Sequence, residues 1–351
     1  MKISRVFSVF FSASAVLSLT VFGQTAPAPS QEAYCSAFAE KFAAAEKQNA
    51  TALAGSDGWL FLAAECRLLS VGRFWGEDAG KVSRSPKPEA ADPIPAIVHF
   101  QQQLKERGIE LLLVPVPPKA AIYPGKLLPG LDANKGDPAA ELTRFYDELR
   151  AKGVDVLDLT EVFRKNRADE RGPVFCKTDT HWSGVGCMLA GKAIAEKIRT
   201  KIPPASPKRY DENWEEIRIE GDLPTLLPTG TPKPEAEKIE IRKVTEKGGD
   251  QAVTPDANSP VLVLGDSHTL VFHEFLGTQS GLIDQLTAEL HQAPDLIGIR
   301  GSGSTQVRKD LYRRSVREAG WLAKKKIVIW CFTAREFTEA DQGWQKLPVA
   351  K

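Results

Sequence analysis

One serine of the chain stands where an apolar run ends and a turn begins. The run Val261-Leu-Val-Leu264 is followed directly by Gly265-Asp-Ser-His-Thr269, and we expect a helix to begin there. A serine at such a strand end is exposed at the rim of a sheet, with its hydroxyl near the positive end of the next helix. That placement suits attack on a carbonyl, because the helix end favours the developing oxyanion. The competing interpretation is that Asp266 or Ser267 only caps the helix.

A second polar element, Thr178-Asp-Thr-His-Trp182, precedes a helix predicted to begin near Gly184. Asp179 and His181 are separated by one residue, so both side chains can reach the same side of an extended or turning segment. A carboxylate bound to one imidazole nitrogen fixes the tautomer and lets the other nitrogen take the proton of a serine. Ser267, His181 and Asp179 are therefore our candidates for nucleophile, base and orienting acid. A capping Asp beside a structural His would produce the same Asp-x-His pattern.

The histidine and cysteine spacing argues against metal chemistry. His268 and His273 flank the serine, and together with Asp179 and His181 they are the alternative set of metal ligands. No histidine pair has the i, i+4 spacing of a helical zinc motif, and the cysteines do not cluster. His99 and His291 fit surface or packing positions. We therefore expect no metal and no cofactor.

Apolar segments alternate with amphipathic ones along most of the chain. The predicted strands are residues 109–116, 154–159, 261–264, 295–299 and 326–332, and the predicted helices are 31–50, 95–108, 138–153, 184–199 and 304 to about 322. This alternation predicts an α/β fold in which helices cover both faces of a mainly parallel sheet. Ligands in such folds bind at the carboxyl ends of strands, where Ser267 lies. Residues 201–260, rich in Pro, Glu and Lys, are predicted to be an inserted irregular or hairpin-bearing segment.

The bulk composition limits the partners. Lys and Arg number 46 against 45 Asp and Glu, and removing Lys2 and Arg5 with a cleaved leader leaves 44 against 45, or −1. This balance provides no general attraction to nucleic acid or anionic lipid. The 351 residues suit one elaborated domain, which we place at residues 27–351.

Residues 1–26 are predicted to be a signal peptide, because a basic start with Lys2 and Arg5 precedes an apolar run over residues 6–22. Cleavage could follow Gly23 or Ala26, and we expect a periplasmic protein. The alternative is an uncleaved membrane anchor, since the run is near the lower length limit for spanning a bilayer.

Export permits disulfides, and the chain has five cysteines. Cys35 with Cys66, and Cys176 with Cys187, are the simplest pairs, but the sequence does not decide the pairing. Cys331 lies in a predicted buried strand and is our candidate for the free thiol.

Taken together, the Asp-Thr-His-Trp and Gly-Asp-Ser elements resemble the alginate O-acetyltransferase group of SGNH hydrolase-like proteins, the AlgX and AlgJ type. Three further stretches agree, Asp57-Gly-Trp-Leu-Phe-Leu62, Val114-Pro-Val-Pro-Pro-Lys-Ala-Ala-Ile-Tyr-Pro124 and Ile329-Trp-Cys-Phe-Thr-Ala-Arg-Glu-Phe337. The resemblance implies an SGNH-hydrolase-like, flavodoxin-like fold in which the serine follows the Asp-x-His element. It also implies that Ser267 is the nucleophile, His181 the general base and Asp179 its partner.

The resemblance implies transfer of an acetyl group, through acetyl-Ser267, to an extracytoplasmic polysaccharide such as an alginate-like exopolysaccharide or another cell-envelope glycan. The acetyl donor could be delivered by a membrane partner protein. A glycan O-acetyl esterase of the same fold and a catalytically inactive glycan-binding scaffold are the alternatives. Two departures stand out. His268 follows the serine where an aromatic residue is usual, and no carbohydrate-binding module is expected after Phe337.

Several other residues are weaker candidates. The turn with Gly301 and Gly303 could add an oxyanion donor to the Ser267 amide, or could be a plain loop. Contact with the sugar or its carboxylate is a candidate role for Lys119, Tyr123, Trp182 and Arg335, with a structural role as the alternative. A basic helix face is either solvated or in contact with an acidic glycan; its members are Arg308, Lys309, Arg313, Arg314 and Arg317.

Overall fold

The structure is a computed structural model that describes residues 30–131, 136–202 and 209–351. The predicted signal peptide lies outside these ranges. Within them, no helix combines the length and the apolar character that crossing a bilayer requires.

A five-stranded parallel sheet in the order β4-β3-β9-β7-β8 forms the centre of the fold. Its strands are β3 (Glu110–Val116), β4 (Asp155–Val156), β7 (Val261–Gly265), β8 (Asp295–Gly298) and β9 (Ile327–Thr333). Every residue of β7 and β9 is buried, as expected for strands covered on both faces. The predicted α/β fold with a parallel sheet is therefore confirmed. Because β9 lies between β3 and β7, segments far apart in sequence meet at one edge of the sheet.

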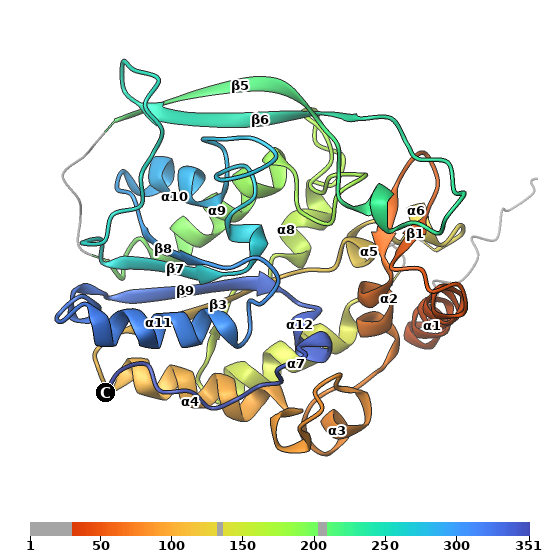
Figure 1. The fold of residues 1–351 in the computed structure, drawn as a ribbon, viewed down its shortest axis with the longest axis horizontal. Helices are drawn as coiled ribbons and strands as arrows, with labels where there is room; N and C mark the ends of the chain where they lie inside the picture. Colours follow the sequence, from red (N-terminus) through yellow and green to blue (C-terminus); the bar gives the residue numbers. More distant parts are fainter. Residues whose placement is uncertain (1–29, 132–135, 203–208) are drawn as a thin grey trace, which may run out of the picture.

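Helices cover both faces of the sheet (Figure 1). On the lower face in that view lie α4 (Pro93–Lys105), α7 (Ala140–Ala151) and α11 (Gln306–Arg317), and on the upper face α8 (Thr160–Lys165), α9 (Gly184–Ile198) and α10 (Leu282–Leu290). Local signals set their starts: the side chains of Asp92 and Ser183 cap α4 and α9. Each helix buries an apolar face, as α7 does with Leu142, Phe145, Tyr146 and Leu149.

The N-terminal part packs at one end of the sheet. Helix α1 (Gln31–Lys47) lies against α2 (Ala63–Ser70), and the hairpin of β1 (Ala52–Ala54) and β2 (Leu60–Leu62) joins them. Four further helices are short, α3 (Ala79–Val82), α5 (Lys119–Ile122), α6 (Pro124–Leu127) and α12 (Glu336–Glu339). Among the described residues, the 3-10 turns are η1 (Gly76–Asp78), η2 (Pro88–Ala90), η3 (Leu223–Leu226), η4 (Ser267–Thr269) and η5 (Leu322–Lys324).

The predicted insertion contains a long antiparallel ribbon of β5 (Tyr210–Ile219) and β6 (Glu237–Glu246), as the alternating run in this segment indicated. The ribbon lies across the upper helical layer, and β6 contacts both α9 and α10 (Figure 1). Its Glu237 end and η3 return to the carboxyl edge of the sheet.

The helix predicted directly after Ser267 does not form. Only the single turn η4 is present, and an irregular segment follows until α10 begins at Leu282. Phe272, Leu276 and Gln279 adopt positive φ angles of 60, 60 and 63°, which turn the chain away from a helical path. A full helix dipole is therefore not aimed at Ser267.

The predicted Cys35–Cys66 and Cys176–Cys187 disulfides are also not formed, since all five thiols are free. The Cys176 thiol donates to the Trp182 carbonyl at 3.6 Å, and the Cys35 sulfur accepts from Gln31 Nε2 at 3.6 Å. Burial raises the pKa of the Cys176, Cys187 and Cys331 thiols, so all three behave as small apolar side chains.

Candidate active site

Ser267 is held at the end of β7 by the residues before it. A Cβ atom on Gly265 would lie 2.0 Å from the carbonyl oxygen of Cys331 in β9, so only glycine fits between the strands. The buried carboxylate of Asp266 accepts from the His268 amide at 2.9 Å and from the Thr333 amide at 2.7 Å. Asp266 thus caps η4 and ties the end of β7 to the end of β9. Asp266 is therefore the residue that caps η4. Ser267 is partly exposed, and its hydroxyl is not needed for capping.

Ser267, His181 and Asp179 meet in one hydrogen-bonded chain. His181 Nε2 lies 2.7 Å from Ser267 Oγ, and His181 Nδ1 lies 2.6 Å from Asp179 Oδ1. With its proton on Nδ1, the ring donates to the carboxylate and presents an acceptor nitrogen to the hydroxyl. Asp179 and His181 are 2 and 7% exposed, so their contact is shielded from water. This arrangement can move a proton from the serine to the imidazole.

The loop that carries Asp179 and His181 is fixed by the buried ammonium of Lys119. Lys119 Nζ donates to the carbonyls of Asp179 at 2.7 Å and Cys176 at 2.9 Å, with a longer contact of 3.4 Å to Lys177. The side chain is 1% exposed, and burial lowers its pKa, which the carboxylates around it, Glu65 first, partly oppose. Because the ammonium is occupied by backbone carbonyls, Lys119 positions the loop instead of facing a sugar.

Glu237, at the start of β6, holds the same loop from the other side. Its carboxylate accepts from the amides of Lys177 at 2.9 Å and Thr178 at 3.0 Å, and from the Thr178 hydroxyl at 3.1 Å. The inserted ribbon therefore supplies an anchor for the loop.

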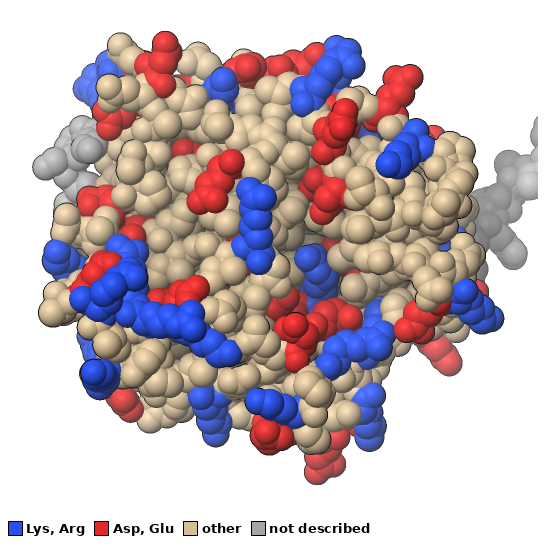
Figure 2. All heavy atoms as spheres, viewed as in Figure 1, with Lys and Arg blue, Asp and Glu red and all other residues tan. Residues whose placement is uncertain are grey.

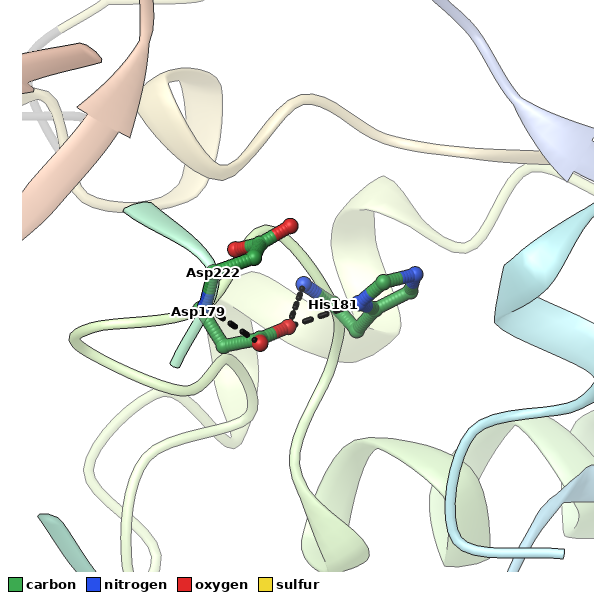
Figure 3. Close-up of side chains that lie close together, drawn as sticks. All are labelled: Asp179, His181 and Asp222. Carbon is green, nitrogen blue, oxygen red and sulfur yellow. Dashed lines mark hydrogen bonds and ion pairs between the residues drawn. The ribbon is translucent and has the colours of Figure 1, made fainter. Parts of the chain in front are cut away.

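The second oxygen of Asp179 is bound by a backbone amide from the insertion. The Asp222 N–H donates to Asp179 Oδ2 at 3.0 Å, while the Asp222 carboxylate accepts from the Thr180 amide at 2.8 Å and hydroxyl at 2.7 Å. Gly221 makes this approach possible, since a Cβ there would lie 2.0 Å from the Thr178 carbonyl oxygen. Figure 3 shows the Asp179 carboxylate bonded to His181 on one side and to the Asp222 backbone on the other, with His181 Nε2 pointing away from both.

Asp179, His181 and Asp222 also lie close enough to be considered as metal ligands, with ligand atoms within 4.8 Å of one another. Their oxygens, however, accept the N–H and O–H bonds just described, so these atoms do not form an open ligand set. The alternative ligands go elsewhere. His268 Nδ1 contacts Asp266 at 3.3 Å, and His273 Nδ1 contacts Asp284 at 3.0 Å.

The electrostatics keep both carboxylates of the site ionised. Burial by itself raises the pKa of Asp179, but the hydrogen bond and charge of His181 and the amide donors overcome it and hold the pKa at about 2. Asp266 behaves in the same way: burial is overcome by His268, the Thr333 amide and Arg335, and the pKa is about 2. Burial lowers the pKa of His268, whose ring lies 4.7 Å from that of His181.

Three other predicted contact residues have structural partners. The Tyr123 hydroxyl donates to the Arg167 carbonyl and accepts from the Val174 amide, both at 2.9 Å. Trp182 is fully buried against His268 and Phe163. Arg335 Nη1 donates to the Thr333 hydroxyl at 3.0 Å, next to the Asp266 anchor. Tyr123 and Trp182 thus pack the scaffold, and Arg335 contributes positive charge beside Asp266.

The two glycines predicted near the oxyanion differ in their surroundings. Gly301 is exposed and has a φ of 90°, and nothing lies within 4 Å of the position that a Cβ would take. Gly303 is buried, and a Cβ there would lie 2.4 Å from Phe332 Cβ and 3.0 Å from Asp266 Cβ. Only Gly303 therefore packs directly beside the residue that precedes Ser267.

The basic helix predicted from the sequence does not present a single charged face. Arg308 is fully buried and donates to the carbonyls of Ser304 at 2.6 Å and Gln345 at 2.9 Å. The others are paired: Lys309 with Gln342, Arg313 with Asp310, Arg314 with Asp295, and Arg317 with Glu318.

Sequence reasoning missed four residues of the site, Asp222, Glu237, Phe275 and Arg300. Phe275 packs edge-on against His181, with ring centroids 5.5 Å apart. Asp222 and Glu237 come from the insertion, and Glu237 stands at the start of the alternating run without any local signal of its role. Arg300 was detectable only as a polar residue directly after a predicted strand.

Comparison with known proteins identifies the family of this chain. A family model described as "SGNH hydrolase-like domain, acetyltransferase AlgX" matches residues 52–334. The chain belongs to this family. A curated relative, the probable alginate O-acetylase AlgJ of Pseudomonas fluorescens, is 29% identical over 181 residues, 48% of this chain and 44% of the relative. The match thus spans less than half of that relative's length.

Solved structures support the fold of the AlgX family. The O-acetyltransferase domain of Pseudomonas putida AlgJ has a TM-score of 0.62 at 21% identity, covering 83% of this chain and 93% of that one. Pseudomonas aeruginosa AlgX has a TM-score of 0.59 at 17% identity, covering 83% and 63%. The predicted SGNH-like architecture and the family resemblance are both confirmed.

Proposed function

We propose that this protein is an O-acetyltransferase that modifies an extracytoplasmic polysaccharide through an acetyl-Ser267 intermediate, with residues 27–351 as one catalytic domain. The observation that carries the proposal is the continuous contact from Asp179 Oδ1 through the His181 ring to Ser267 Oγ, with distances of 2.6 and 2.7 Å. This is the geometry that nucleophilic acyl transfer requires.

In the first half-reaction, His181 Nε2 takes the proton of Ser267 as Oγ attacks the acetyl carbonyl carbon of the donor. The tetrahedral intermediate collapses, the leaving group of the donor departs with the proton from His181, and acetyl-Ser267 remains. In the second half, a sugar hydroxyl gives its proton to His181 and attacks the acetyl-serine. The Ser267 oxygen then leaves and recovers the proton, which regenerates the free enzyme.

Two groups are proposed to stabilise the oxyanion. The Ser267 amide is the first of η4, and the first amides of a helical turn have no partner within it. The Gly303 segment is the second candidate, because it packs against Asp266. Asp179 remains ionised and stabilises the imidazolium that forms in each half-reaction.

The names of the relatives support a polysaccharide acceptor, alginate or a similar glycan. Delivery of the acetyl donor by a membrane partner protein is part of the proposal. The basic and apolar pattern of residues 1–26 supports export to the periplasm. N-terminal sequencing of the mature protein from the periplasmic fraction tests this, with a chain beginning after Gly23 or Ala26 as the expected result.

A purified protein incubated with an activated acetyl ester, with and without oligosaccharides, tests the reaction. Transferase activity predicts acetylated sugar and an acetyl adduct on Ser267. If free acetate is released at the same rate with and without sugar, an esterase is favoured. The partial exposure of Ser267 is compatible with attack by water. If a serine-directed phosphonate fails to label Ser267, or Ser267→Ala leaves ester turnover unchanged, Ser267 is not the nucleophile, and the glycan-binding scaffold is favoured.

A further inference from the structure

Arg300 lies beside the proposed nucleophile because of the sheet order. It is the second residue after β8, which pairs with β7 in parallel. The Ile299 amide donates to the Gly265 carbonyl at 3.0 Å, which fixes the chain one residue before Arg300 against the chain two residues before Ser267. Arg300 is therefore at the rim of the site.

An aromatic ring connects the Arg300 side chain to the base. The guanidinium carbon lies 4.0 Å from the centroid of the Phe275 ring, close enough for a cation–π contact. The Phe275 ring in turn meets His181, with centroids 5.5 Å apart and an angle of 76° between the planes. Phe275 thus holds the guanidinium at a defined place relative to the imidazole, which limits the entropy that Arg300 would lose on binding a ligand.

Arg300 differs from the neighbouring arginines in its charge balance. Arg313, Arg314 and Arg317 of α11 each form an ion pair, at 2.7 Å with Asp310, 3.0 Å with Asp295 and 2.9 Å with Glu318. Arg300 is exposed, and no carboxylate of the described residues lies within ion-pair distance of it. Its guanidinium donors are open to a ligand.

The surface beside Arg300 has room for an extended chain. Ile299 and Glu274, the neighbours in sequence of Arg300 and Phe275, line a groove of about 560 Å³ between β8 and α11. Figure 2 shows basic side chains over α11 with acidic ones among them. The arginines that line the groove form the ion pairs of α11, whereas no ion pair joins Arg300 to another described residue.

We propose that Arg300 binds a carboxylate of the acceptor glycan and so makes the site selective for an anionic polysaccharide. This inference rests on the proposed acetyltransferase function. A planar guanidinium matches a carboxylate through two parallel hydrogen bonds, and such charge-assisted contacts are about twice as strong as neutral ones. Bound there, a uronate residue would lie next to Phe275 while a hydroxyl of the same chain approaches acetyl-Ser267.

The test compares two acceptors with the same sugar backbone, an oligouronate and the same oligosaccharide with its carboxyls reduced to hydroxymethyl groups, and counts only acetylation at the hydroxyls that both share. Arg300→Gln is expected to raise KM for the oligouronate about tenfold, the equivalent of roughly 1.4 kcal/mol. KM for the reduced acceptor is expected to change less than twofold, and kcat to change little for either. Arg300→Lys should retain part of the preference, and added salt should weaken it.

Arg144→Gln is the matched control, because Arg144 of α7 is an exposed arginine that does not line this groove and already has an acidic partner, Glu141. It should leave both KM values as they are. If Arg300→Gln raises KM equally for both acceptors, Arg300 only supports Phe275 and His181. If KM for the oligouronate does not change, Arg300 does not bind the carboxylate. Either result overturns the proposal. If the unaltered protein acetylates neither acceptor, the transferase proposal fails, and calorimetric binding of the two oligosaccharides still tests Arg300.

Discussion

His181 Nε2 lies 2.7 Å from Ser267 Oγ, across a separation of 86 residues in the sequence. Two independent frameworks set this distance. Asp266 and Gly265 fix the serine to the end of the sheet, and Lys119, Glu237 and Asp222 fix the loop that carries the histidine. A rate that depends on this contact should therefore be sensitive to residues that touch no substrate.

Asp179→Asn tests the orienting role of the carboxylate. An amide group in its place can donate to His181 Nδ1, which forces the proton onto Nε2 and removes the base from Ser267. We expect kcat for ester turnover to fall about 10³- to 10⁴-fold, with the fold retained. Circular dichroism and thermal unfolding check the fold. Turnover within tenfold of the unaltered protein would contradict the assignment of His181 as the base.

Lys119→Met tests the buried ammonium as a positioning residue. The substitution keeps an unbranched side chain one atom shorter than lysine but leaves the carbonyls of Asp179 and Cys176 without their donor. Losing hydrogen bonds from a charged group should cost about 3 kcal/mol of unfolding free energy, and the displaced loop should lower kcat more than it raises KM. Lys126→Met, at a more exposed lysine paired with Asp57, is the control and should change neither quantity much. Equal unfolding free energies and equal kcat values for the two variants would show that Lys119 does not position the loop.

Gly221→Ala tests the close approach of the insertion to the Asp179 loop. The added methyl group would meet the Thr178 carbonyl oxygen at 2.0 Å, so the backbone must shift and the Asp222 amide must leave Asp179. We expect a loss of stability of about 1–3 kcal/mol and at least a tenfold fall in kcat. Gly80→Ala provides the comparison, because nothing lies within 4 Å of a Cβ at this position of α3. Stability and rate that match those of Gly80→Ala would show that the contact is dispensable.

Acid should destabilise the fold through Asp179 and Asp266. Both have pKa values of about 2 in the folded protein, below the ordinary value for an aspartate. The unfolded chain therefore binds more protons than the folded one as the pH falls, so the stabilisation is present above pH 4 and is lost toward pH 2. Each group contributes about 2 kcal/mol. Denaturant unfolding at pH 5, 4 and 3 should show the decline, and Asp266→Asn should flatten part of it. Identical pH slopes for the two proteins would be inconsistent with an ionised Asp266.

Glu336 should make the folded protein less stable as the pH rises, the opposite of the effect of Asp179 and Asp266. Burial raises its pKa to about 7 despite its hydrogen bonds from Ser304, and Asp266 adds to the shift. Because the folded pKa exceeds the unfolded one, stability is full below about pH 4.5 and declines as the pH rises toward 7. Relative to Glu336→Gln, the unaltered protein should lose up to about 3 kcal/mol between pH 5 and 8. Unfolding curves that stay parallel over this range would show an ordinary carboxyl.

The sequence by itself predicted the elements that depend on local pattern. The apolar runs 261–264 and 326–332 form central strands, and the alternating run within residues 201–260 forms the β5–β6 ribbon. Burial on both faces requires a continuous apolar run, and burial on one face requires alternating apolar and polar residues, so both patterns can be recognised in one sequence. A serine at a strand end and an Asp-x-His pair, each of which could also have been only a helix cap, together led to Ser267, His181 and Asp179. The structure brings these three side chains into contact.

Tertiary structure decided what depends on long-range contacts. Lys119 resembled a sugar-binding residue in the sequence, and Arg308 resembled part of a basic surface, yet each donates to buried carbonyls supplied by distant segments. The expected helix after Ser267 is limited to the single turn η4, because the chain beyond it adopts positive φ angles at Phe272, Leu276 and Gln279. The position of Arg300 beside the site depends on the pairing of β8 with β7 and on the contact of Phe275 with His181, neither of which the sequence shows. Local patterns encode burial, whereas hydrogen-bond partners and unpaired charges depend on which segments the fold brings together.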